Sequence, residues 1–255
     1  MIALPIYPLS LIFCLSLVLL LAALEAGRWF GRRALGRDDV TTLEAAVLGL
    51  LALMIGFSVS LAIGRFEARR DTIVDEGNAI GTLGLRATLL GAAEADAVLA
   101  RLIPYTEARL TLTASVSEPP VMQATIDRSN AILMELWARA RQGAGRDPQM
   151  VPTGLYVEAL NALIDMQEKR LNALRSRVPS VVLLALYGVA AVACGFMGYA
   201  VGLNRRRQRG PVYVVAILIA AVVLLIQDLD RPGTGFITVS QKPLLDTLES
   251  LKQLR

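Results

Sequence analysis

Long stretches without any charged residue alternate with stretches crowded with charges, and this pattern limits the possible folds more than any other feature. No Asp, Glu, Lys or Arg occurs within 1–24, 45–63, 179–203 or 211–226. About 20 apolar residues in a helix cross the hydrocarbon core of a bilayer, which is roughly 30 Å thick. We therefore expect four membrane-spanning helices. The first, over about 7–24, lacks the basic start and small-residue cleavage site of a signal peptide, so we interpret it as an uncleaved span.

The polar segment between the second and third spans shows helical periodicity and no strand-like alternation. We expect 65–90 to prolong the second span as one helix, because no helix stop follows the span. Other helices are expected over 92–114, 121–141, 152–175 and 243–254, with Pro104 kinking or breaking the first of these. The prediction is an all-α integral membrane protein divided into spans 1 and 2 (1–64), an extramembrane helical bundle (65–178), spans 3 and 4 (179–228), and a C-terminal turn and amphipathic helix (229–255).

The composition argues against catalysis and against nucleic-acid binding. The chain has no histidine, which removes the commonest general base and metal ligand. Cys14 and Cys194 lie in apolar stretches and are interpreted as small buried hydrophobic residues. The net charge of +4 comes from arginines at the ends of apolar stretches, a placement that suits anionic lipid headgroups. We expect no enzymatic activity, no cofactor and no nucleic-acid partner.

Carboxylates occur in two places that deserve comparison with known sites. Asp71, Asp75 and Glu76 are interleaved with arginines at helical spacing, which favours a solvated, salt-bridged helix face. Asp228 and Asp230 precede a Pro-Gly turn where the fourth span ends. They are interpreted as capping residues of the span, and a calcium site made of their oxygens is the weaker alternative.

Small residues recur every four positions on two spans, which lets helix backbones approach closely in lipid. On the second span they are Gly56, Ser60 and Gly64, and on the third Gly198 and Gly202. We expect both sets to serve helix packing.

Four segments, in this order, resemble the bacterial bestrophin-like domain family. They are RFEARR at 65–70, VDEGNAIGT at 74–82, LDRP at 229–232 and VSQKP at 239–243. More distantly, GFSVSLAIGRF at 56–66 is similar to the pore segment of true bestrophins, which are pentameric anion channels. The resemblance implies a homo-oligomer, a pentamer in bestrophins, that conducts inorganic anions such as chloride and sits as a multi-pass protein in the bacterial plasma membrane.

The resemblance also implies particular pore residues. Gly49, Leu53 and Phe57 correspond to the neck, one position being a glycine where bestrophins have a bulky residue. Arg65 and Arg69 are expected to attract anions at its end. Bestrophins have an acidic segment after the fourth span, which Asp228 and Asp230 match only in reduced form, so calcium activation does not follow.

Two questions stay open at the level of sequence. The two short loops between spans carry arginines at 28–37 and at 205–209. The positive-inside rule therefore places these loops in the cytoplasm and the helical bundle outside the cell. The bestrophin arrangement instead places the bundle in the cytosol. The alternative function is a non-conducting membrane scaffold or sensor whose helical bundle binds a partner, because no charge lies within the spans.

Overall fold

The computed structural model describes residues 8–34, 40–145, 151–203 and 209–255, and within these ranges it contains helices and no strands. The long helices are α1 (Leu9–Arg33), α2 (Thr41–Ala87), α3 (Ala92–Leu112), α4 (Pro119–Ala144), α5 (Val151–Arg175), α6 (Ser180–Leu203), α7 (Gly210–Asp230) and α8 (Lys242–Leu254). Short 3-10 helices follow α2 and α3 as η2 (Thr88–Leu90) and η3 (Ala114–Ser117). The predicted all-α architecture is confirmed, and α3 continues through Pro104 without a break.

The chain divides into two compact units, and α2 contributes to both. The first unit comprises 1–65 and 177–231, and the second comprises 66–176 and 232–255. Four helical stretches are long and apolar enough to cross a membrane: Leu9–Arg33, Thr41–Leu90, Val151–Leu203 and Gly210–Asp230. Within the third stretch α6 is the apolar helix, so α1, the first part of α2, α6 and α7 are the four spans.

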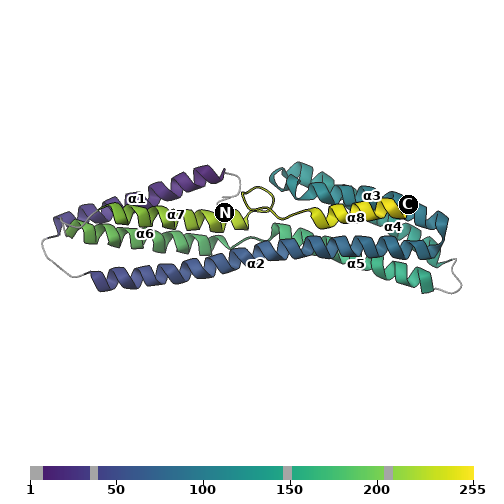
Figure 1. Cartoon of the computed structure of the whole chain (residues 1–255), viewed down its shortest axis with the longest axis horizontal. Coiled ribbons are helices and arrows are strands. Elements are labelled where there is room, and N and C mark those ends of the chain that lie inside the picture. The colour runs from purple at the N-terminus through teal and green to yellow at the C-terminus, as the bar shows by residue number, and fades with distance from the viewer. Residues whose placement is uncertain (1–7, 35–39, 146–150, 204–208) are drawn as a thin grey trace. The chain divides into compact units, whose positions relative to one another are not determined.

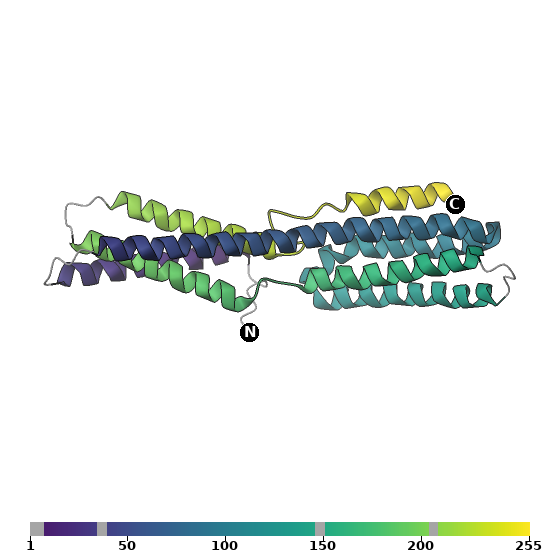
Figure 2. The ribbon, with the colours of Figure 1, turned by 90° about the horizontal axis from the view of Figure 1, so that it is seen from below.

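In the first unit α1 and α6 lie side by side along most of their lengths (Figures 1 and 2). Glycines make this approach possible. A Cβ added at Gly198 would overlap the Leu24 carbonyl oxygen, and one at Gly202 would lie 2.5 Å from the Arg28 carbonyl oxygen. The expectation that Gly198 and Gly202 serve packing is therefore correct. On α2, by contrast, a Cβ at Gly56 or Gly64 would meet nothing within 4 Å.

A short line of polar side chains also connects the spans of this unit. The Tyr187 hydroxyl of α6 lies 2.6 Å from the Ser16 hydroxyl of α1 and accepts a hydrogen bond of 2.6 Å from Gln227 Nε2 of α7. Each group has a partner, as polar groups within a bilayer require. Cys194 is buried as expected, but Cys14 is exposed on its own chain, so its expected burial is wrong for the single subunit.

The second unit is a helical bundle built around one apolar core. Figure 2 shows α3, α4, α5, α8 and the second part of α2 running alongside one another. Its core includes Ile80 and Leu83 of α2, Leu102 of α3, Leu136 of α4 and Leu163 of α5, all fully buried. The amphipathic helix α8 adds Leu244 and Leu251, which are buried on its apolar side.

A carboxylate between two arginines lies inside this core. Glu76 of α2 is completely buried and accepts hydrogen bonds of 2.6 Å from Arg109 Nε of α3 and from Arg170 Nη1 of α5. The expectation that Glu76 lies on a solvated face is wrong. Asp71 and Asp75 do stay near the surface, paired with Arg70 and Lys169. A helical spacing alone does not reveal that the second unit covers one side of α2 and leaves the other side exposed.

Further hydrogen bonds hold Arg170 and Glu76 in place, whereas Arg109 Nη1 and Nη2 are buried without a hydrogen-bond partner among the described residues. Arg170 Nη2 donates to the Arg109 carbonyl, the Thr113 hydroxyl and Gln241 Oε1, at 3.1 to 3.2 Å. The Tyr105 hydroxyl donates to Glu76 Oε1 at 3.1 Å. Burial, followed by the charge of Glu76, raises the pKa of Tyr105 well above its usual value, so this donor stays protonated. We name Glu76, Arg109 and Arg170 the buried charge cluster.

We expect Gly198→Ala to destabilise the first unit by roughly 1 to 3 kcal/mol, because the new methyl group must push α6 away from α1. Gly188→Ala on the same helix is the matched control, since a Cβ there meets nothing within 4 Å. Thermal unfolding in detergent measures both. Equal melting temperatures for the two variants would show that the close contact of α1 and α6 is not needed.

We expect Glu76→Gln to cost about 3 to 5 kcal/mol of stability, because it leaves two buried guanidinium groups without a counter-charge. Asp71→Asn, which removes an exposed carboxylate from the same helix, should change stability by less than about 1 kcal/mol. Urea unfolding followed by circular dichroism gives both values. The prediction fails if Glu76→Gln is as mild as Asp71→Asn.

Candidate functional site

The part of α2 in the first unit has one face that no other described part of its own chain covers. Leu53 and Phe57 are 55% and 61% exposed. A Cβ at Gly49 would meet nothing within 4 Å, as at Gly56 and Gly64. These residues recur at three-, four- and seven-residue steps, so they share one side of the helix. We call this the open face of α2. It contains the three residues that the bestrophin resemblance implies for a pore neck.

The opposite side of α2 packs inward. Leu51, Ser58 and Ala62 are buried, and the Ser58 hydroxyl has no hydrogen-bond partner. A small hydroxyl on that side leaves room for a neighbouring helix. Because burial and exposure alternate with the helical period, α2 has a definite inner and outer side within its own subunit.

The two arginines expected beside the neck differ in their surroundings. Arg65 is exposed. Arg69 is only 2% exposed and takes part in interactions with other residues of the chain. Of the two, only Arg65 presents its charge to solvent in the subunit.

Asp228 and Asp230 lie at the end of α7, which extends past Gln227 and includes both residues. Both carboxylates are buried, at 3% and 8% exposure. Asp230 Oδ1 accepts the Val178 N–H at 2.8 Å, and its carbonyl accepts from Arg177 Nη1 at 3.0 Å. The Asp228 carboxylate lies close enough to Arg231 for their charges to interact. Among the described residues no three Asp, Glu, Cys or His side chains gather as metal ligands. Asp230 thus joins the start of the third span to the end of the fourth, and Asp228 interacts with Arg231 at the end of the fourth span itself.

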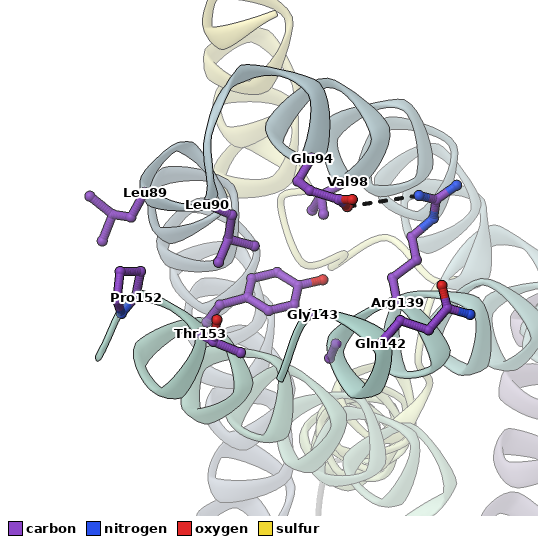
Figure 3. A pocket seen from close by; sticks show the side chains of 11 residues that line it. Leu89, Leu90, Glu94, Val98, Arg139, Gln142, Gly143, Pro152 and Thr153 are labelled. Carbon is purple, nitrogen blue, oxygen red and sulfur yellow. Dashed lines mark ion pairs between the residues drawn. The ribbon is translucent and has the colours of Figure 1, made fainter. Parts of the chain in front are cut away.

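A cavity of about 360 Å³ lies at one end of the second unit (Figure 3). Leu89, Leu90 and Pro152 line one side, and Glu94 and Arg139 face each other on the other side. Tyr156 of α5 also lines it, and its buried hydroxyl has no hydrogen-bond partner. Nothing in the sequence marks this cavity, because its residues come from η2, α3, α4 and α5 and share no motif.

Sequence reasoning also missed Arg109 and Arg170 of the buried charge cluster. Both occur in helical segments with several exposed charges, so neither differs visibly from a solvated arginine. The helical period could have indicated the burial of Arg170. Arg170 and Gln167 lie three residues apart on the side of α5 that also carries Leu160, Leu163 and Leu171.

We expect the double variant Asp228→Asn and Asp230→Asn to lower the melting temperature without creating or removing a calcium response. The variant removes two buried negative charges next to Arg177 and Arg231, a loss of about 1 to 3 kcal/mol. Asp246→Asn, on the exposed side of α8, is the control. A calcium-dependent rise in the wild-type melting temperature that the double variant lacks would instead establish a metal site.

Comparison with proteins of known structure supports the same architecture. A membrane protein carrying a glycine-to-alanine substitution has 17% sequence identity and a TM-score of 0.71, with 97% of this chain and 98% of the other covered. An aspartate-to-alanine variant of a bacterial bestrophin homologue from Klebsiella pneumoniae has 16% identity and a TM-score of 0.70, with 96% and 98% covered. The same homologue, solved by zinc phasing, has 16% sequence identity and a TM-score of 0.67, with 97% of each chain covered. These likenesses establish the fold.

Family assignment rests on the sequence. No curated protein matches the chain significantly. The family model described as the bestrophin-like domain matches residues 10–244, which is most of the chain and includes all four spans. Proteins of this family are known as membrane channels, so membership supports a membrane channel as the general function. The chain is therefore a four-span helical membrane protein that belongs to the bestrophin-like family.

Proposed function

We propose that this protein forms a homo-oligomeric channel of the bacterial plasma membrane, pentameric by resemblance, whose pore is lined by the open face of α2 and conducts anions such as chloride. The observation that carries the proposal is the exposure of Leu53 and Phe57 next to glycines that meet nothing in their own chain. A face of this kind on a membrane helix borders either lipid or the same face of other subunits.

The composition of the open face favours a shared axis over lipid. Gly49, Gly56, Ser60 and Gly64 leave gaps between Leu53 and Phe57, and small residues allow helices to approach closely in a bilayer. If several subunits turn this face toward one axis, Leu53 and Phe57 form two apolar rings. Apolar rings in a pore resist ion entry until they widen and become wetted.

Arg65 supports anion conduction. It follows the neck by two helical turns, it is exposed, and no ion pair is found for it among the described residues. A ring of such guanidinium groups would raise the local concentration of anions at one end of the neck. Arg65 is the exposed one of the two arginines expected beside the neck, because Arg69 is buried.

A specific observation favours cation conduction as the second candidate. Seven-residue steps along α2 lead from Ser60 to Glu67 and from Gly64 to Asp71, and both carboxylates are exposed. Seven residues are nearly two helical turns, so Glu67 and Asp71 lie closer to the line of the open face than Arg65 does. Rings of carboxylates select cations. The anion channel and the cation channel share the same pore along α2. They differ in whether Arg65 or the carboxylates of Glu67 and Asp71 dominate the electrostatic potential at the end of the neck.

We expect the double variant Leu53→Ala and Phe57→Ala to pass ions several-fold faster than wild type in liposomes, because both apolar rings shrink. The matched control is Leu184→Ala with Leu218→Ala, on α6 and α7, whose exposed fractions of 59% and 58% are similar. Chloride flux against potassium gluconate, and potassium flux against a large organic cation, identify the permeant ion.

The outcomes separate the alternatives. Faster chloride flux supports the anion channel, and faster potassium flux that falls in Glu67→Gln with Asp71→Asn supports the cation channel. A well-assembled double variant with unchanged flux of both ions would contradict a pore along α2 and favour the non-conducting scaffold, whose helical bundle binds a partner. If Leu53 and Phe57 were packing residues instead, their loss would cost several kcal/mol of stability with no gain in flux.

A further inference from the structure

The cavity at the end of the second unit contains a hydrogen-bond donor with nothing to donate to. Tyr156 is 1% exposed, and its hydroxyl lies buried without a partner. Burial raises the pKa of Tyr156 to about 12, so the hydroxyl keeps its proton at physiological pH. A buried donor without an acceptor is costly, and it is rare in folded proteins unless a water, ion or ligand completes it.

The charges beside this hydroxyl nearly cancel. Arg139 of α4 and Glu94 of α3 both act electrostatically on Tyr156, in opposite directions. They form a loose pair with 3.9 Å between Arg139 Nη1 and Glu94 Oε2, and each side chain is about half exposed (Figure 3). A ligand with a net charge would have to separate this pair or be repelled by one member of it, whereas an uncharged ligand leaves the pair in place.

The rest of the lining combines apolar side chains with the polar Gln142 and Thr153. Leu89, Leu90 and Pro152 line one side, and Val98 of α3 lies near Glu94 (Figure 3). The volume of about 360 Å³ is at the lower end of the range for small-molecule sites, which are typically apolar with a few placed polar groups.

We propose that this cavity binds a small, uncharged, largely apolar molecule with one hydrogen-bond acceptor, which the Tyr156 hydroxyl engages. A carbonyl compound with a hydrocarbon body has this chemistry. The apolar part packs against Leu90, Val98 and Pro152, and the acceptor receives the Tyr156 O–H. The proposal concerns binding only and does not depend on ion conduction, so it stands or fails separately from the channel.

Three probes of nearly equal size test the chemistry. Acetophenone is uncharged and carries an acceptor, ethylbenzene lacks the acceptor, and benzoate carries a negative charge. Saturation-transfer NMR on the whole protein in nanodiscs measures the binding of each. We expect acetophenone to bind about three- to tenfold more tightly than ethylbenzene, the effect of one net hydrogen bond. Tighter binding of benzoate than of acetophenone would overturn the uncharged class, and equal binding of acetophenone and ethylbenzene would overturn the role of the hydroxyl.

Three variants locate the site. Tyr156→Phe should remove the preference for acetophenone over ethylbenzene while leaving the melting temperature unchanged or higher, because the hydroxyl has no partner in the chain to lose. Gly143→Leu should abolish binding of both probes, since Gly143 lines the cavity and a Cβ there meets nothing within 4 Å. Gly154→Leu is the matched control, equally open and outside the lining, and should bind like wild type. A preference that survives Tyr156→Phe, or binding that survives Gly143→Leu, would place the probes elsewhere and refute the proposal.

Discussion

The position of α2 in the second unit depends on Glu76, a buried carboxylate that accepts hydrogen bonds from arginines of two other helices. Charges taken out of water cost several kcal/mol each, and the short contacts of Glu76 with both arginines offset part of this cost, although one positive charge remains in the cluster. Because Arg109 comes from α3 and Arg170 from α5, satisfying Glu76 fixes the rotation of α2 about its own axis. Arg170 also contacts Gln241 just before α8, so the C-terminal helix is joined to the same point.

The rotation of α2 has a functional consequence, because the side that is not buried becomes a free surface. In the first unit that surface carries Leu53 and Phe57 among glycines, and in the second it carries exposed carboxylates such as Glu67 and Asp71. In the proposed channel the same helix would supply both an apolar constriction and charged groups beyond it. Assembly of the subunits would then decide which side chains, Arg65 or the carboxylates, reach the axis.

Much of the fold could be predicted from the sequence, since hydropathy and helical period are local properties. The spans, the continuation of the second span into one long helix, and the four later helices all follow from them. The structure has each of these helices, and the helix of the first span continues nine residues past its predicted end, to Arg33. The clear error concerns which side of a helix is covered, since Glu76 was expected in solvent and is buried. The expected packing of Gly56 and Gly64 stays a prediction, because in the single subunit a Cβ at either position meets nothing within 4 Å.

The sequence by itself thus determined that this chain crosses a membrane four times, that it is helical throughout the described ranges, and which family it resembles. Only the tertiary structure decided the partners: Gly198 against Leu24, Asp230 against Val178, Glu76 between Arg109 and Arg170, and the cavity around Tyr156. The physical reason is that periodicity states how residues repeat along one helix, whereas burial depends on residues far away in the sequence, as with Leu24 and Gly198. The cost of an unpaired buried charge then selects a single arrangement among the many that the hydrophobic pattern allows.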